Sequence, residues 1–556
     1  MQKIKEFVLN KNNTKYFIFA AFIILYFWGL GSYGLMNHDE GRYAEIPREM
    51  LEKGDFVTPT LNYLLYFEKP ALHYWQTALS LAVFGNNEFA ARFSTCLLGL
   101  LGIFFTWLFA RKVYDEATAN LSAVVLGTGI LYYAIAHINI IDMTVSFYML
   151  LSLFAFYFYF TENKKVWAFV FYGAMALAVL SKGLIGVVLP GGVVFWFMIF
   201  TRRWDIIKKV LYIPGILFFF ALSAPWFYLV CKANPDFFRF FFIQEHLLRY
   251  TTKMHGRYEA WWFFIPVIIA GLYPWTSGLF LSVKNMFSKK QDVLFLTIWF
   301  FVMFIFFSIS SSKLIPYIIP LMPPLAIIIA RNILIGIKEE EKSGRRAKGL
   351  AVLIFHTVFT AALVIAAAVI FGRHIHFRDI DDVLLYKNTI LTLIGLSVIF
   401  TALGWALLKK PYARLISFCV FAFLFLFAAK PGFVTISNER STHLVAKSML
   451  RYVNPQDIIV NYDYYFQDSP FYFQRRVIIV DWHGELEYGM NNAPQDERKQ
   501  WVIEDPDIHT LLERALEPGQ KMYFIVRDKS HNKYPLKEET RFIEKVGKYN
   551  IYVREK

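Results

Sequence analysis

Carboxylates, cations and phenols gather in one stretch of the chain, residues 37–75. Two clusters lie inside it, residues 39–43 (DEGRY) and 66–70 (YFEKP), and apolar sequence flanks each cluster. Charged groups are costly close to lipid, and where they persist they usually bind a ligand or take part in catalysis. The alternative is an amphipathic helix at the membrane surface, whose long charged side chains reach out to water.

These residue types suit the transfer of a sugar from a phosphate leaving group. Lys69 and Arg249 can hold a phosphate by charge-assisted hydrogen bonds, and Tyr317 can add a hydroxyl donor. Asp39 would face the anomeric carbon or the attacking oxygen. No serine or cysteine constellation suggests a covalent intermediate, so direct displacement at the anomeric carbon is the simpler mechanism.

The acceptor decides what Asp39 must do. A phosphate acceptor is already ionised at neutral pH and needs positioning, with little base catalysis. A Ser or Thr hydroxyl acceptor needs a general base that takes its proton in the transition state. The sequence leaves both alternatives open.

The composition is that of a membrane protein. Of the 556 residues, 56% are hydrophobic, and apolar runs of about 20 residues, the length that crosses a bilayer, recur as far as position 430. The net charge of +15 comes mostly from short loops between these runs, so we expect no nucleic-acid partner. The three cysteines lie far apart in or beside apolar runs and imply no disulfide.

Hydropathy predicts about 13 membrane spans by the usual length criterion. The predicted limits are 16–34, 87–110, 117–135, 141–160, 166–181, 184–200, 210–230, 260–282, 293–309, 315–335, 349–371, 388–408 and 412–428. We interpret the first segment as a span and not a cleaved signal peptide, because its apolar core is long and no small-x-small cleavage site follows it.

The loops alternate in charge, which predicts the orientation of the chain. Short basic loops, such as those at 202–203, 289–290 and 409–410, belong in the cytoplasm together with the N-terminus. The loops that carry carboxylates and histidines then lie outside, in the periplasm of a bacterium with two membranes. The protein is therefore expected in the inner membrane, and an odd number of spans carries the C-terminus into the periplasm.

The composition changes after Lys430. Residues 431–556 are more polar, with strand-like runs at 457–466, 476–482, 521–527 and 551–554 and a helical pattern around 506–516. We predict an α-helical polytopic membrane domain over residues 1–430, which carries the catalytic site, and a small periplasmic α/β domain over residues 431–556.

The candidate site residues all fall in the outer loops. ATP and nucleotide sugars are normally absent there, so an activated sugar donor has to be carried on a lipid. A polyprenyl-phosphate sugar fits this requirement, because its tail can lie among the membrane helices and lipids while its phosphate reaches the polar loops.

Six stretches resemble one family of enzymes. They are DEGRYAEIPREML from 39, YFEKP from 66, LSKG from 180, EHLLRY from 245, WWFFIPVIIAG from 261 and SKLIPY from 312. These stretches occur in this order within the first 330 residues. Through them the chain resembles the GT-C glycosyltransferases of the protein O-mannosyltransferase superfamily. It is most similar to the branch that acts on lipid A, which implies aminoarabinose on undecaprenyl phosphate as the donor and a lipid A phosphate as the acceptor. Such an added cationic sugar masks negative charge on lipopolysaccharide and weakens the binding of cationic peptides such as polymyxin.

The resemblance also implies roles for individual residues. Asp39 would be the principal catalytic carboxylate and Asp142 its acidic partner, while Glu68 would hold a divalent metal ion, although no companion ligands are evident in the sequence. The remaining residues would bind substrate. The carrier phosphate would be bound by Lys69, Arg249 and Tyr317. The other contacts would come from Arg42, Tyr43, Tyr66, Lys182 and His246.

Several of these residues have a structural alternative. Asp142 could cap the fourth span, and Asp39 could cap a helix that begins at Glu40 and that Pro47 must kink or interrupt. Lys182 could simply mark the end of a helix. His246 is as compatible with an interfacial position as with a functional one.

Two other functions remain open at this point. A sister enzyme could carry another sugar, such as mannose, to a protein or polysaccharide. A lipid transporter is a different class, but we find no charged residue near the middle of a span and no paired discontinuous helices, which transporters often have.

Overall fold

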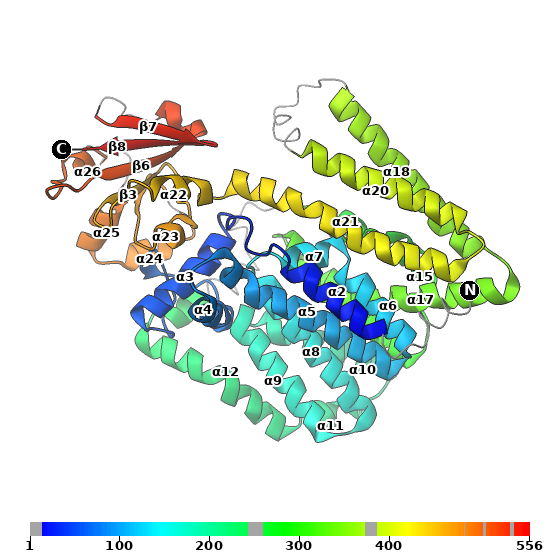
Figure 1. The fold of residues 1–556 in the computed structure, drawn as a ribbon. Coiled ribbons are helices and arrows are strands. Elements are labelled where there is room, and N and C mark those ends of the chain that lie inside the picture. Colours follow the sequence, from blue (N-terminus) through cyan, green and yellow to red (C-terminus); the bar gives the residue numbers. More distant parts are fainter. Residues whose placement is uncertain are drawn as a thin grey trace. The chain divides into compact units, whose positions relative to one another are not determined.

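The computed structural model describes residues 14–242, 259–372, 386–482, 484–503, 508–533 and 539–555 (Figure 1). Two compact units emerge. Unit 1 comprises Met1–Trp28, Thr95–Pro225 and Gln244–Gly432, and unit 2 comprises Gly29–Ser94, Trp226–Ile243 and Phe433–Lys556. Each unit is considered by itself below. The predicted division of the chain at residue 430 between a catalytic and a periplasmic domain stays a prediction.

Unit 1 is helical. Its helices are α2 (Thr14–Phe27), α6 (Glu116–Gly127), α7 (Ile130–Ala136), α8 (Ile141–Glu162), α9 (Lys165–Lys182), α10 (Ile185–Thr201), α11 (Ile206–Val210), α14 (Phe264–Gly271), α15 (Thr276–Met286), α16 (Gln291–Ile309), η2 (Ile315–Leu321), α17 (Met322–Ser343), α18 (Ala347–Gly372) and α20 (Lys387–Ala406). Three more, α5 (Glu88–Val113), α12 (Ile213–Ala233) and α21 (Pro411–Arg440), contribute residues to both units.

Each of the 13 predicted apolar segments contains helix, so the polytopic helical class is confirmed. Within the described residues, nine helices are long and apolar enough to cross a membrane, or eleven if each of two bent pairs is one span. The two remaining segments form the shorter helices α2, of 14 residues, and α10, of 17 residues. The first apolar segment was predicted to extend to residue 34, but helix α2 ends at Phe27. Gly29, two residues beyond the end of the helix, adopts a φ of +63°.

The two bent pairs correct the expectation of uninterrupted helices. Helices α6 and α7 meet at 66°, and α14 and α15 meet at 119°. The second break contains Pro274, which has no N–H to continue the hydrogen-bond ladder of a helix. Hydropathy averages over such short breaks, so the sequence predicted single spans at both places.

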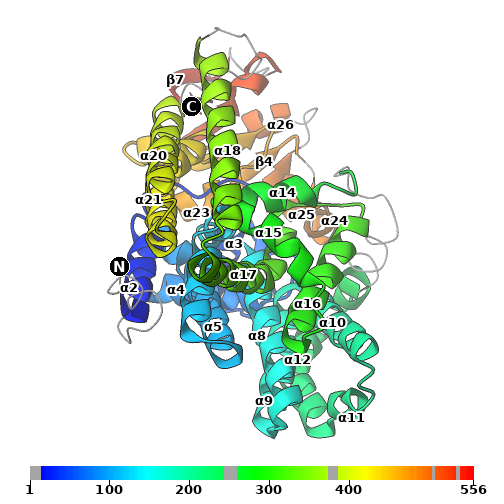
Figure 2. The ribbon, with the colours of Figure 1, turned by 90° about the vertical axis from the view of Figure 1, so that its right-hand side faces the viewer.

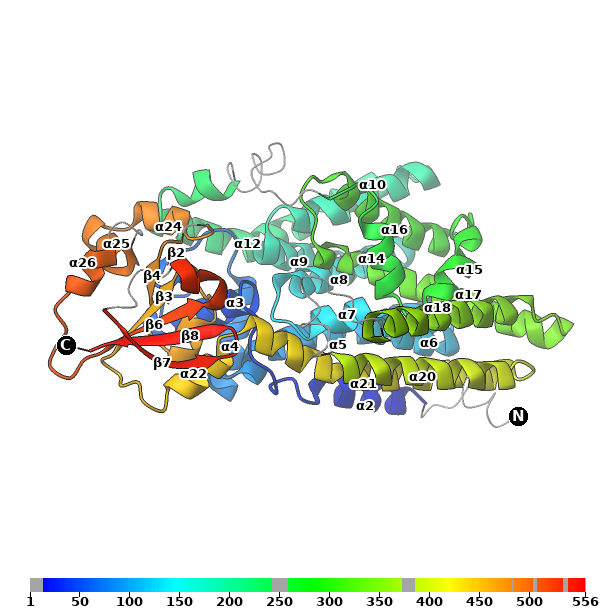
Figure 3. The same cartoon turned by 90° about the horizontal axis from the view of Figure 1, so that it is seen from above.

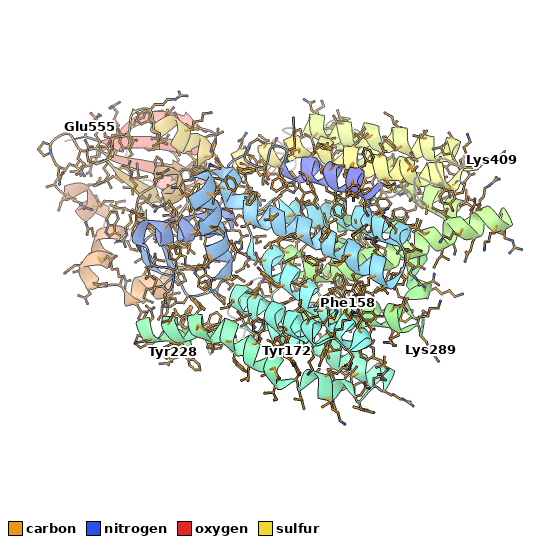
Figure 4. All side chains as sticks on the ribbon, turned by 60° about the horizontal axis from the view of Figure 1, so that its bottom comes forward. Phe158, Tyr172, Tyr228, Lys289, Lys409 and Glu555 are labelled. Carbon is orange, nitrogen blue, oxygen red and sulfur yellow. The ribbon has the colours of Figure 1, made fainter. Side chains whose placement is uncertain are left out.

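Helix α8 is the central helix of unit 1. In its most apolar window, 94% of the residues are buried, against 22% for α18 and 17% for α20. The rings of Phe109 and Phe154 stack with centroids 4.1 Å apart, and Trp299 of α16 contacts Phe154 edge-on. Figure 2 shows α18 and α20 as an antiparallel pair apart from the group formed by α8, α9, α10 and α16. Figure 4 places Lys289 and Lys409, from two basic loops, toward the same end of unit 1.

The C-terminal part of unit 2 is built on a mixed sheet. The described residues form strands β3 (Ile458–Tyr462), β4 (Ile478–Val480), β5 (Val502–Ile503), β6 (Met522–Arg527), β7 (Arg541–Val546) and β8 (Tyr549–Arg554), in the order β5-β4-β3-β6-β8-β7. Figure 3 labels all of these strands except β5. The first four strands in that order are parallel, and β8 and β7 are antiparallel to their neighbours. Every residue of β4 and the first five of β6 are buried, as expected for strands covered on both faces.

Short helices accompany the sheet. They are α22 (His443–Met449), α23 (Ser469–Phe473), α24 (Glu487–Asn492), α25 (Gln495–Trp501), α26 (Ile508–Glu513) and the turn η4 (Asp528–Lys533). The predicted strands match β3, β4, β6 and β8, and the predicted helix matches α26, so the α/β character of this region is confirmed. The sequence missed β5, which has two residues, and the edge strand β7, in which three of the six residues are charged and none is buried.

The first polar loop folds into unit 2 as two helices and a hairpin. These are α3 (Glu40–Lys53), β1 (Thr60–Leu61), β2 (Leu64–Leu65) and α4 (Leu72–Phe84). The sequence predicts that Pro47 kinks or interrupts helix α3, but this helix continues through Pro47, so an interruption does not occur. Although its sequence is polar, every residue from Glu40 to Met50 is buried. Its buried charges are paired, since Arg48 binds Glu45 at 2.6 and 2.7 Å.

Candidate active site

Asp39 stands at the start of α3 with its carboxylate partly exposed. The side chain makes no capping hydrogen bond to the helix, so the structural alternative for Asp39 is not supported. Its Oδ1 instead accepts a hydrogen bond of 2.9 Å from Nη2 of Arg42, one turn further along. Because 54% of the Asp39 side chain is exposed and that of Arg42 only 6%, the carboxylate is the accessible end of the pair.

Aromatic rings surround the Arg42 guanidinium. Its Cζ lies 5.0 Å from the ring centroid of Tyr43 and 5.7 Å from that of Tyr66. Burial by itself lowers the pKa of Arg42, but Tyr66, Tyr43 and Asp39 raise it by more, so the pKa lies well above its ordinary value. We call Asp39, Arg42, Tyr43 and Tyr66 the first-loop cluster. The structure thus brings four of the predicted site residues together.

Tyr66 adds a protonated phenol to the first-loop cluster. It is 1% exposed, and burial raises the pKa of its hydroxyl well above the usual 10. Among the residues that the structure describes, the hydroxyl has no hydrogen-bond partner. A buried donor of this kind suits a ligand oxygen.

Glu68 and Lys69, which follow Phe67, bring a carboxylate and an ammonium group into unit 2. Lys69 Nζ donates to the backbone carbonyl of Glu68 at 2.8 Å and lies 3.9 Å from the Glu68 carboxylate. Both side chains are mostly buried, at 17% and 16% exposure. Lys69 therefore brings an ammonium group into unit 2, a group that is able to bind phosphate.

The residues around Glu68 do not fit a metal ion. In the described ranges, no three His, Cys, Asp or Glu side chains are close enough together to hold one. A divalent cation needs several oxygen or nitrogen ligands, whereas Glu68 forms an ion pair with the Lys69 ammonium. The metal-binding role of Glu68 stays a prediction, and no step proposed below depends on a metal.

Unit 1 contains a second group of predicted site residues. Asp142 lies in the first turn of α8, and Lys182 is the last residue of α9. Lys182 Nζ donates to Oδ1 of Asp142 in a close ion pair and lies 4.6 Å from the ring centroid of Tyr317, which η2 carries. The N-cap position of α8 is Ile140, so Asp142 is not the capping residue that the structural alternative required. His246 and Arg249 lie outside the described residues.

Sequence reasoning missed three groups in unit 2. Arg92 and Glu40, both 0% exposed, form a bidentate pair at 2.7 and 2.8 Å. Glu485, from the segment between β4 and α24, forms an ion pair with Nη1 of Arg42. Asp468, also fully buried, accepts hydrogen bonds from the Ser441 hydroxyl and the Thr442 amide. Arg92 left a signal as a charged residue near the start of a predicted span, and Glu40 belongs to the polar cluster at residues 39–43, whereas Glu485 and Asp468 left none.

Comparisons with known proteins show which proteins this chain is similar to. Residues 68–229 match the family model described as dolichyl-phosphate-mannose-protein mannosyltransferase. The undecaprenyl phosphate-alpha-4-amino-4-deoxy-L-arabinose arabinosyl transferase 1 of Proteus mirabilis is 36% identical over 326 residues, which are 57% of this chain and 59% of that protein. That alignment therefore spans about three fifths of the relative. The corresponding transferase of Pseudomonas paraeruginosa is 27% identical over 95% of each chain.

A solved structure is similar over nearly the full length. The crystal structure of ArnT from Cupriavidus metallidurans bound to undecaprenyl phosphate superimposes with a TM-score of 0.86 at 26% identity, covering 98% of each chain. The chain is therefore similar to the protein mannosyltransferase family over residues 68–229, and over nearly its full length it resembles the undecaprenyl-phosphate aminoarabinose transferases.

Proposed function

We propose that this protein transfers 4-amino-4-deoxy-L-arabinose from undecaprenyl phosphate to a phosphate of lipid A. The reaction takes place at the periplasmic face of the bacterial inner membrane. The similarity over 98% of the chain to a transferase structure that contains undecaprenyl phosphate carries the proposal. The relatives named as aminoarabinose transferases support the choice of sugar.

The reaction is a displacement at the anomeric carbon. An oxygen of the lipid A phosphate forms the new C–O bond, while the bond from the anomeric carbon to the carrier phosphate breaks and its electron pair leaves on undecaprenyl phosphate. Lys69, Arg249 and Tyr317 bind the carrier phosphate and stabilise the charge that develops on it. Arg42, Tyr43, Tyr66, Lys182 and His246 contribute the remaining contacts to donor and acceptor.

Asp39 acts on the sugar and not as a strong base. The acceptor phosphate is already ionised, so no proton has to be removed for the attack. The Asp39 carboxylate, held by Arg42 at 2.9 Å and partly exposed, stabilises positive charge at the anomeric carbon in the transition state. Asp142, paired with Lys182, is the second carboxylate of the reaction.

The orientation of the chain belongs to the same proposal. The N-terminus lies in the cytoplasm, and the C-terminal region lies in the periplasm, where both the donor sugar and the lipid A headgroup are exposed. The charge of the loops supports this orientation, because the basic loops at Lys289 and Lys409 lie toward the same end of unit 1 (Figure 4).

A second candidate function is favoured by one observation. The family model that matches residues 68–229 describes mannosyltransferases that act on proteins. A protein hydroxyl as acceptor would require Asp39 to remove the proton of that hydroxyl. The two functions differ in the product that accumulates, a modified lipid or a modified protein.

The test is mass spectrometry of lipid A from a host that makes the aminoarabinose donor but lacks its own transferase. Expression of the wild-type chain should restore the aminoarabinose adduct, and Asp39→Asn should not. Immunoblots of the membrane fraction verify that both proteins are present. A wild-type chain that reaches the membrane and leaves lipid A unmodified would contradict the proposal.

A further inference from the structure

A segment of the C-terminal region, residues 484–490, packs against the β1–β2 hairpin within unit 2. The hairpin turn consists of Asn62 and Tyr63, which adopt φ values of +51° and +66°, as in a two-residue type I′ turn. The Asn62 side chain donates to the Val477 carbonyl at 2.9 Å and accepts from the Val477 amide at 3.0 Å. The amide of Asn62, itself 0% exposed, therefore fastens the strand β4 region to the hairpin.

Two further contacts fix the segment after β4. A Cβ atom on Gly489 would lie 2.5 Å from the backbone oxygen of Leu65, so α24 and β2 approach as closely as only glycine permits. The ring of Tyr488 packs against Phe67 and Phe240, with centroids 5.6 and 4.2 Å away. Glu485 precedes these contacts by three and four residues, so its place beside the first-loop cluster follows from several independent contacts.

Glu485 shares the Arg42 guanidinium with Asp39. Arg42 binds Asp39 through Nη2 and Glu485 through Nη1. The Glu485 side chain is 30% exposed, whereas that of Arg42 is only 6% exposed. The two carboxylates thus flank one buried cation, and both keep an accessible part.

Carboxylates and cations lie side by side in this part of unit 2. Glu68 pairs with Lys69, while Asp39 and Glu485 share Arg42. An accessible carboxylate repels phosphate and attracts a cation, and at short range a charged hydrogen bond is stronger than a neutral one.

We propose that Glu485 is a specificity residue that binds the protonated amine of the donor sugar. This inference rests on the proposed function, in which the transferred sugar carries a primary amine that is positively charged at neutral pH. Asp39 then faces the anomeric carbon while Glu485 holds the amine of the same ring. The C-terminal region thereby takes a direct part in selecting the sugar.

The experiment compares two donors with purified full-length protein in proteoliposomes that contain lipid A. One donor is undecaprenyl phosphate-aminoarabinose, and the other is the same lipid with its amine acetylated, which removes the charge. We expect Glu485→Gln to lower kcat/KM about 10- to 100-fold for the amino donor, mainly through KM. For the neutral donor the same variant should change kcat/KM less than about threefold. Where transfer of the neutral donor is too slow to follow, its inhibition constant against the amino donor replaces kcat/KM.

Two further variants serve as controls. Glu485→Asp keeps the charge on a shorter side chain and should recover part of the selectivity. Glu487→Gln removes a charge from an exposed residue two positions away and should leave both donors unaffected. Thermal unfolding of each variant reports whether the fold is intact.

The outcomes separate this inference from the proposed function. An equal loss for both donors, or no loss for either, would overturn the role of Glu485 while transfer by the wild type upholds the function. A wild-type protein that transfers neither donor to lipid A would overturn the proposed function and this inference with it.

Discussion

Single residues in this protein owe their chemistry to the partners that neighbouring elements supply. Asp39 follows a residue with positive φ, His38, and begins a helix without capping it, so its carboxylate stays available. Lys182 would be an ordinary helix-terminal lysine if the first turn of α8 did not bring Asp142 to it. The sequence shows which residue types are present, but it does not show which of them pair. The pairs become known only from the fold.

The Asp142–Lys182 pair should behave as one functional unit. Asp142 is 6% exposed, so removing Lys182 leaves a nearly buried charge without its cation. We expect Lys182→Met and Asp142→Asn each to lower kcat at least 100-fold, and the double variant to be no worse than the poorer single one. Steady-state kinetics of the three variants measure the coupling. Effects that multiply in the double variant would show that the two residues act independently.

Asp468 should give the stability of the protein a pH dependence. Burial raises the pKa of its carboxyl to about 6, partly offset by the Thr442 amide and the Ser441 hydroxyl, whereas an aspartate in an unfolded chain titrates near 3.9. The folded state therefore binds the proton more tightly. The contribution of Asp468 to stability is complete below about pH 4 and is lost as the pH rises through 6.

The variant Asp468→Asn removes this titration. The wild type should lose stability relative to this variant between pH 4 and pH 7. The difference in the free energy of unfolding should change by about 2 to 3 kcal/mol, which appears as a growing difference in melting temperature. Thermal unfolding at several pH values measures the difference, and Asp496→Asn, at an exposed position, provides the control. A difference that does not change with pH would show that Asp468 keeps an ordinary pKa in the folded protein.

At the scale of elements, buried ion pairs determine where α3 begins. Arg92 donates to both oxygens of Glu40, to the carbonyls of Leu30, Tyr33 and Gly34, and lies 3.8 Å from the centre of the Tyr33 ring. One guanidinium thus joins α5, the turn after residue 29 and the first residue of α3. Asp39 is the residue before Glu40, so this network determines its position.

Breaking the pair should disturb both stability and activity. Arg92→Leu leaves the Glu40 carboxylate buried without a partner cation, at a cost of about 3 to 5 kcal/mol. Arg92→Leu combined with Glu40→Leu removes both charges and should recover stability but not transfer activity, because the Asp39 backbone loses its anchor. Melting temperature and kcat report the two effects. Arg111→Leu, a half-exposed site on the same helix, should change neither, and recovery of full activity in the double variant would argue against a positioning role.

The accuracy of prediction differed among the elements for physical reasons. Apolar runs of about 20 residues predicted the helices well, since burial and backbone hydrogen bonding in lipid act on the whole run. The breaks at residues 128–129 and 272–275 are too short to alter a hydropathy average. In the first loop, α3 is buried despite its polar sequence because Arg48 and Arg92 neutralise its carboxylates, and the partner Arg92 lies 52 residues away from Glu40.

Residues of the candidate site could be predicted to lie together where they are close in sequence. Contacts between residues that are distant in sequence were missed. Asp39, Arg42 and Tyr43 lie within one helical turn, so their meeting follows from helix periodicity. Asp142 and Lys182 are predicted separately, and the packing of α8 on α9 joins them. Glu485 lies more than 400 residues from Arg42 in a region without a recognisable motif, so no local pattern could indicate it.

For the whole molecule, the loop charges predict one orientation in the membrane. In a background in which Cys96, Cys231 and Cys419 are replaced by alanine, new cysteines at Lys289, Lys409 and Glu555 can report on each side. A thiol reagent that does not cross the inner membrane should label Glu555→Cys in spheroplasts, and should label Lys289→Cys and Lys409→Cys only after lysis. The reverse pattern would contradict the orientation, since the basic loops would then lie in the periplasm.

The proposed function requires that this chain moves aminoarabinose from a lipid phosphate to lipid A, with Asp39 as the essential carboxylate. Its most direct test is reconstitution of purified protein with undecaprenyl phosphate-aminoarabinose and lipid A, followed by mass spectrometry of both lipids. The wild type should convert lipid A to its aminoarabinose adduct and release undecaprenyl phosphate in equal amount, and Asp39→Asn should be at least 1,000-fold slower. Full activity of Asp39→Asn, or a wild type that consumes no donor, would contradict this account.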